Sequence, residues 1–115
     1  MKIDELTDIL KSKGFEEKKK DSGCEYSKKQ GHVELLCYVE PKMGVQFVAF
    51  YRWEEDGWGE NGVKGTYDIT IDKLKRDSEP ISLIFKRTLS DMPECIGDKA
   101  NAHSEVKKVI EELLD

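Results

Sequence analysis

Two neighbouring stretches of alternating apolar residues constrain the fold of this chain most strongly. In residues 32–40, HVELLCYVE, every second residue is apolar, as in a strand that buries one face. Residues 44–53, GVQFVAFYRW, alternate in the same way but also carry Val48 and Phe50 on the other side. Strands that are apolar on both sides are typical of the covered interior of a sheet. The two stretches therefore predict adjoining strands, of which the second is central and covered on both faces.

Three further segments extend this predicted sheet. FEEKKK and CEYSKKQ indicate two polar strands joined by a tight turn at residues 21–23, and we expect this hairpin at a sheet edge. Residues 63–71, VKGTYDITI, alternate again, with four apolar residues on one side: Val63, Tyr67, Ile69 and Ile71. Together the segments predict an antiparallel meander of four to five strands.

Apolar residues at helical spacing flank the predicted strands. Ile3–Lys13 carries one apolar stripe that Gly14 ends, and Phe15 is placed to touch Leu10 across the cap. At the other end of the chain, apolar residues recur at the spacing of a helix face: Val106, Val109, Ile110, Leu113 and Leu114. Residues 81–89 fit a helix that follows Pro80, with a strand as the alternative.

Strands grouped together, with helices at both ends, predict an α+β fold. We expect a single domain over residues 1–115, with an N-terminal helix and one or two C-terminal helices packed on one face of the meander. The sequence leaves open whether the chain's own helices or a second copy cover the double-sided strand at residues 45–53. A homodimer is therefore one of the arrangements that it allows.

The composition is that of a small acidic domain. Of 115 residues, 37% are hydrophobic and 37% charged, and the net charge is −5. An acidic surface repels nucleic-acid phosphates and anionic membranes and favours cationic partners. No apolar run is long enough to span a membrane, and the first residues include acids, unlike a signal peptide. Three cysteines without a C-x-x-C pair indicate free thiols, so we expect a cytoplasmic protein.

The stretch GWGENG, residues 57–62, has the G-x-G-x-x-G spacing of phosphate-binding loops. A dinucleotide site needs a helix after the glycines, whereas a strand is predicted there, and the surrounding acids repel phosphate. Asp56-Gly57 and Asn61-Gly62 are instead favoured hairpin-turn pairs. The acids do not stand in the register of a calcium loop either. We therefore expect a turn, and no cofactor.

Turn chemistry does not explain Trp58, which lies in this turn among four acidic residues. A tryptophan folded back on the sheet would add to the core, whereas a displayed one would anchor a protein interface. Acids around it would steer a partner with a basic surface. The predicted interface consists of five residues: Glu54, Glu55, Asp56, Trp58 and Glu60.

No catalytic or metal-binding set stands out from the rest of the sequence. The candidate metal ligands are Cys24, His32, Cys37, Cys95 and His103. Two of the Cys–His pairs have a C-x7-H spacing, whereas structural zinc sites usually pair ligands two to four residues apart. Cys95 and His103 also lack the flanking signature of a nucleophile pair. We predict no metal and no enzymatic activity.

The expected function is that of a small non-enzymatic protein-binding module, such as an inhibitor, immunity or anti-defence protein of a mobile element. The alternative is a nucleic-acid- or nucleotide-binding module that uses the first hairpin. Basic residues interleaved with an aromatic one can follow a single-stranded backbone, and six residues have this pattern: Lys18, Lys19, Lys20, Tyr26, Lys28 and Lys29. Edge strands also carry lysines to prevent edge-to-edge pairing, so nucleic acid is the less favoured partner.

Overall fold

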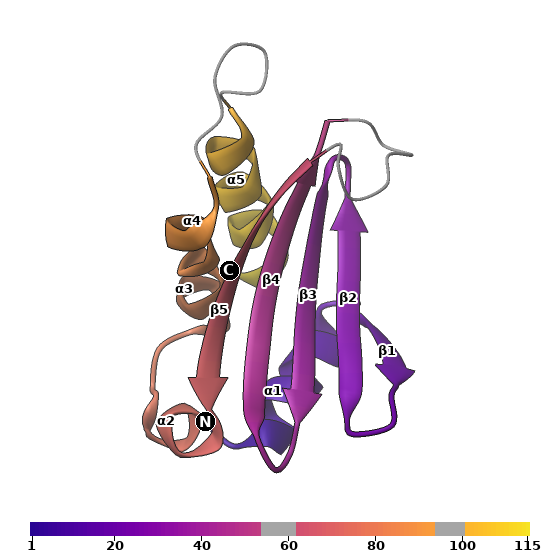
Figure 1. Cartoon of the computed structure of the whole chain (residues 1–115), viewed down its shortest axis with the longest axis vertical. Helices are drawn as coiled ribbons and strands as arrows, with labels where there is room; N and C mark the ends of the chain where they lie inside the picture. The colour runs from indigo at the N-terminus through magenta and orange to yellow at the C-terminus, as the bar shows by residue number, and fades with distance from the viewer. Residues whose placement is uncertain (54–61, 94–100) are drawn as a thin grey trace.

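The computed structural model describes residues 1–53, 62–93 and 101–115, and a five-stranded antiparallel sheet organises them (Figure 1). Its strands are β1 (Glu16–Lys19), β2 (Cys24–Gln30), β3 (Val33–Glu40), β4 (Gly44–Arg52) and β5 (Gly62–Thr70). The strand order is β1-β2-β3-β4-β5, so each strand pairs with its neighbour in sequence. This confirms the predicted meander and places the lysine-rich strand β1 at an edge.

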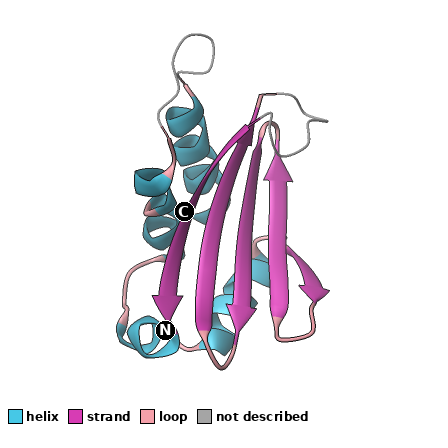
Figure 2. Ribbon diagram, in the orientation of Figure 1, coloured by secondary structure: helices cyan, strands magenta, loops and turns pink. Residues whose placement is uncertain are grey.

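The helices lie before and after the sheet in sequence and pack on one of its faces (Figure 2). They are α1 (Ile3–Ser12), α2 (Ile71–Arg76), α3 (Ile81–Lys86), α4 (Thr88–Asp91) and α5 (Ala102–Leu114). In Figure 1 the strands lie in front of α1 and α5, and no described helix lies over the face turned to the viewer. The chain therefore has the predicted α+β fold. Within the described residues, none of the helices has the length and apolar character needed to cross a membrane.

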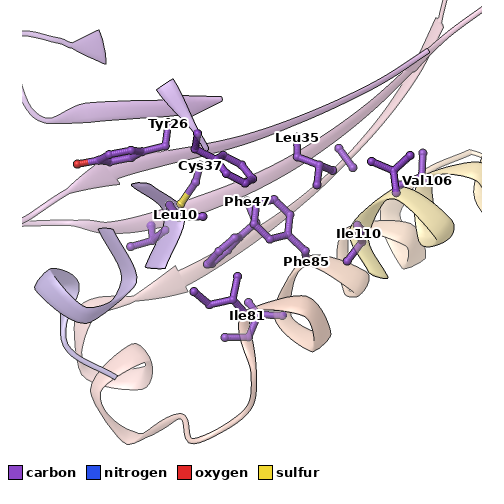
Figure 3. Packing of buried hydrophobic residues seen from close by; sticks show 14 of the residues in the cluster. Leu10, Tyr26, Leu35, Cys37, Phe47, Ile81, Phe85, Val106 and Ile110 are labelled. Atoms are coloured by element: carbon purple, nitrogen blue, oxygen red, sulfur yellow. The ribbon is translucent and has the colours of Figure 1, made fainter. Parts of the chain in front are cut away.

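The core lies between the helices and one face of the sheet (Figure 3). The alternating residues of β3 and β4 point into it, as the sequence predicts, and meet the apolar stripes of α3 and α5. Phe47 and Phe85 pack edge to face, with ring centroids 5.0 Å apart and an interplanar angle of 81°. Such aromatic pairs add specific geometry to the burial of apolar area, which is the main stabilising contribution.

The N-terminal helix ends as the sequence predicts. Gly14 adopts a φ of +88°, which glycine takes without steric cost, and the Phe15 amide donates to the Leu10 carbonyl at 3.0 Å. At the other end of α1, the Met1 ammonium donates to the carbonyls of Leu74 (2.6 Å) and Asp77 (3.0 Å). These bonds connect the start of α1 to the end of α2.

Residues 81–91 are helical, which settles the open choice between helix and strand. The segment divides into α3 and α4, and the buried Thr88 hydroxyl donates to the Phe85 carbonyl at 2.6 Å where they meet. Gly65 on β5 allows α4 to approach closely, because a Cβ there would lie 1.9 Å from the Thr88 carbonyl oxygen. The sequence pattern had predicted only a single helix at this place.

The prediction that β4 is covered on both faces is wrong. The strand is an interior one, paired with β3 and β5 as predicted, but described helices cover only the face that carries Val45, Phe47, Ala49 and Tyr51. The opposite face, with Val48 and Phe50, has no helix over it in the described part of the chain. Burial under helices therefore does not explain why Val48 and Phe50 on this face are apolar.

Candidate functional site

The uncovered face of the sheet, which we call the open face, is the candidate functional surface. Strand pairing places Leu36, Val48 and Thr66 side by side across β3, β4 and β5. Leu36 is 6% exposed and Val48 is 3% exposed, yet neither belongs to the core beneath the helices. The centre of this face is therefore an apolar floor within a more polar rim.

A hollow of about 660 Å³ lies over β3, β4 and β5 on this face. Tyr38, Gln46 and Phe50 are among the half-buried residues that line it. Met43, in the turn between β3 and β4, lines its lower end and is 75% exposed. An exposed methionine beside half-buried aromatic residues is typical of an adaptable protein-contact surface.

The end of the open face near Phe50 is rich in cations. The guanidinium carbon of Arg52 lies 5.1 Å from the centre of the Phe50 ring, and Lys64 Nζ lies 5.9 Å from it. Arg52 also pairs with Glu34 at 3.2 Å. We call this region the cationic end, and define it by the described strand residues Lys29, Arg52, Lys64 and the acid Glu34.

The other end of the open face has the opposite charge. This acidic end is defined by the strand residues Glu25, Glu40, Asp68 and the cation Lys18, as strand pairing and alternation place them. Burial, and then a hydrogen bond donated to Glu25, raise the pKa of Tyr38. The hydroxyl of Tyr38 therefore stays protonated at neutral pH and remains a hydrogen-bond donor.

The lysine-rich hairpin does not form the surface that the nucleic-acid alternative needs. Tyr26 is 3% exposed, faces the helices, and donates to Glu17 at 2.6 Å, so it cannot stack on a base. The strand pairing also divides the lysines of the hairpin between the two faces. Lys18 and Lys29 lie on the open face, Lys19 and Lys28 on the helix side, and Lys20 follows β1 in the turn. The predicted grouping of six residues is therefore wrong.

The predicted acidic interface at Glu54, Glu55, Asp56, Trp58 and Glu60 lies outside the described residues. The described strands on either side, β4 and β5, do form an antiparallel pair, from Arg52 opposite Gly62 to Gly44 opposite Thr70. GWGENG is therefore followed by a strand and not by the helix that a dinucleotide site requires. The interface role of Trp58 stays a prediction.

The candidate metal ligands do not come together. Among the described residues, no three His, Cys, Asp or Glu side chains are placed to hold a metal ion, and Cys95 lies outside them. Cys37 is buried in the core beside Leu35 and Phe47 (Figure 3), and burial raises the pKa of its thiol. His32 Nδ1 lies 2.7 Å from the Arg52 carbonyl oxygen, which gives it a structural partner.

Sequence reasoning missed a second polar cluster, at the outer edge of β5. Lys73 and Arg87 both donate to the hydroxyl oxygen of Tyr67, at 3.0 and 2.9 Å. Arg87 also pairs with Glu79 at 2.6 Å and lies 3.6 Å from Asp77. Only the alternation of β5 pointed to Tyr67, and it could not show that three separate elements meet at its hydroxyl. Carboxylates match Arg87, and the bonds from Lys73 and Arg87 to Tyr67 join α2 and the end of α3 to β5.

The fold and this face define the class of protein: an α+β protein with an antiparallel sheet covered by helices on one side. No protein-family model, curated protein sequence or solved structure matches the chain at a significant level. The function must therefore be argued from the face itself.

Proposed function

We propose that this chain is a non-enzymatic protein-binding module whose contact surface is the open face of the sheet. The observation that carries the proposal is the hollow over β3, β4 and β5, whose accessible apolar groups are half-buried Tyr38 and Phe50 and exposed Met43. Helices leave this surface uncovered in the described part of the chain, whereas they cover the opposite face from α1 to α5. An apolar centre within a polar rim is the usual anatomy of a protein interface.

The two charged ends specify the chemistry of the partner. A protein that fits this face presents an apolar centre, acidic groups toward Arg52 and Lys64, and basic groups toward Glu40 and Asp68. Complementary charge at the rim affects mainly the rate and the specificity of association. The narrower class predicted from the sequence, an inhibitor, immunity or anti-defence protein, remains part of the proposal.

The proposal is tested by capture from cells of the native host, followed by reconstitution with the purified partner. The variants Phe50→Gln and Met43→Gln change side chains on the open face. The matched control is Leu83→Gln, an apolar residue of α3 that is 45% exposed away from this face. We expect the two face variants to weaken the purified complex by about tenfold or more, as interface anchors do, and the control to leave it unchanged.

Circular dichroism and urea unfolding show whether each variant keeps the fold. A partner that binds the folded face variants as tightly as it binds the wild-type chain would overturn the proposal. Capture lost equally with Leu83→Gln would also overturn it, because the contact surface would then lie on the helices.

A further inference from the structure

The charge pattern of the open face is complementary to itself. Among the described strand residues, three cations and one acid define the cationic end, three acids and one cation define the acidic end, and Glu16 on β1 lies between them. The apolar residues Leu36 and Val48 lie between the two ends. When two such faces are related by a two-fold axis that runs across the strands, each cationic end lies over an acidic end of the other copy.

We infer that a second copy of this chain occupies the open face and forms a symmetric face-to-face dimer. This inference rests on the proposed function, because both use the same surface. The alternative is a two-fold axis that runs along the strands. It would place Lys64 toward Lys29 of the other copy and Asp68 toward Glu25 of the other copy. Both contacts join like charges and are repulsive. Charge therefore selects one orientation of the two sheets, with their strands antiparallel.

The dimensions of the face suit a weak dimer. Five strands of four to nine residues, with a rise of about 3.4 Å per residue and a spacing of about 4.8 Å, give a flat area of roughly 600 Å² per copy. Specific interfaces bury about 800 Å² per partner, so the dimer lies at the small end of that class. Two sheets packed face to face lie about 10 Å apart at an angle near −30°, a geometry common in β-sandwiches. We therefore expect a dimer that dissociates on dilution.

The dimer would regulate the function proposed above. A different protein can reach Tyr38, Met43 and Phe50 on this face only when the second copy has left. Dilution, or a partner with higher affinity, would expose the face. Self-association would also shield Met43 and Phe50, which are otherwise an aggregation hazard in a concentrated solution.

Lys64 and Asp68 provide the sharpest test of the dimer. Both are exposed on β5, point to the open face, and form no ion pair with a described residue. They are four residues apart, about 13 Å along a strand, so they do not pair within one chain. In the dimer, Lys64 of each copy lies over the acidic end of the other copy, to which Asp68 belongs.

The experiment measures self-association of the purified full chain by sedimentation velocity over a range of concentrations. Lys64→Asp alone and Asp68→Lys alone each place like charges across the interface, and each should weaken the dimer by about tenfold or more. An equimolar mixture of the two variants pairs opposite charges again and should form a mixed dimer. The double variant, Lys64→Asp with Asp68→Lys, should dimerise by itself. The control, Lys107→Asp on the exposed side of α5, makes the same charge change and should dimerise like the wild type.

Two results would overturn the inference. One is a wild-type chain that is monomeric at every concentration. The other is a mixture of Lys64→Asp and Asp68→Lys chains that associates no better than either variant alone, with both variants shown to be folded. This experiment contains no other protein. A failure of the dimer would therefore not decide the proposed function, which partner capture with the Phe50 and Met43 variants tests separately.

Discussion

Arg87 donates a hydrogen bond from Nη1 to the Tyr67 hydroxyl oxygen at 2.9 Å, and its guanidinium carbon lies 5.2 Å from the centre of the same ring. Lys73 approaches from α2 and donates to the same oxygen at 3.0 Å. Two cations directed at one phenol oxygen favour its ionised form. The hydrogen bond from Lys73, and then that from Arg87, lower the pKa of Tyr67 against the opposing effect of burial.

Tyr67 should therefore ionise before Tyr26 and Tyr38, whose pKa values are raised. Its folded pKa lies below the unfolded value, so its contribution to stability is present above the ordinary tyrosine pKa and is lost as pH falls through the folded pKa. We expect Tyr67→Phe to remove the first phenolate signal in an ultraviolet pH titration. Lys73→Met should move that signal to higher pH. A first phenolate unchanged in Tyr67→Phe would contradict this assignment.

The bond from Tyr26 to Glu17 predicts a stability difference that depends on pH. Tyr26 donates to Glu17 at 2.6 Å, and Lys11 pairs with the same carboxylate at 3.1 Å. The hydrogen bond from Tyr26, and then that from Lys11, lower the pKa of Glu17, whereas burial and the bond to Glu17 raise the pKa of Tyr26. Tyr26→Phe should lower the free energy of unfolding at neutral pH by about the value of one hydrogen bond.

This difference should shrink at both ends of the pH scale. The contribution of Glu17 is lost as pH falls through its lowered folded pKa. Above the ordinary tyrosine pKa, Tyr26 ionises in the unfolded wild-type chain, and this ionisation favours unfolding. The Tyr26→Phe chain has no hydroxyl at this position to ionise. Urea unfolding of both chains at acid, neutral and alkaline pH measures the effect. A difference that stays constant across this range would show that the bond does not determine these pKa values.

The approach of α4 to β5 predicts that Gly65→Ala is destabilising. The added Cβ would lie 1.9 Å from the Thr88 carbonyl oxygen, a backbone atom that cannot move alone. We expect a loss of about 1–3 kcal/mol or more in the free energy of unfolding, measured in urea. The control is Gly31→Asn, in a turn with a φ of +59° and no atom within 4 Å of the added Cβ. Asparagine tolerates that conformation, so the control should cost less than about 1 kcal/mol.

The burial of Cys37 predicts that its thiol reports unfolding of the whole domain. Its side chain is fully buried in the core, and burial raises the pKa of the thiol. In a chain with Cys24→Ser and Cys95→Ser, we expect Cys37 to be unreactive toward a disulfide reagent in native buffer. Its labelling rate should rise with denaturant in parallel with global unfolding. Rapid labelling of the native chain would show that the core opens locally around β3.

The sequence predicted the strands and helices because their burial follows regular spacing. Val33 to Val39 on β3 and the stripe of α5 lie in the core as alternation and helical periodicity indicate. The turn at Gly14 followed from the backbone freedom of glycine. Alternation failed at Val48 because it shows that a residue is apolar on a given side, but not what covers that side.

The candidate site could be predicted only in part. The apolar residues of β4 were noted, but the sequence could not show that Phe50 lies between Arg52 and Lys64 from two strands, because this depends on strand register. Composition gave a net charge of −5 but not its division into two ends. The lysines around Tyr26 in the sequence predict that it lies on a binding surface. Its position in the strand instead turns it toward the core.

The strand order, which follows the order of the chain, has a consequence for synthesis on the ribosome. Each strand from β2 to β5 finds its pairing partner already made, so the sheet can grow one strand at a time. The side chains of Val106 and Ile110, which cover the core beneath β3 and β4, are translated after all five strands. Until α5 has emerged, the core side of β3 and β4 lacks this cover, and chaperones that bind apolar segments have the longest access to this protein at that stage.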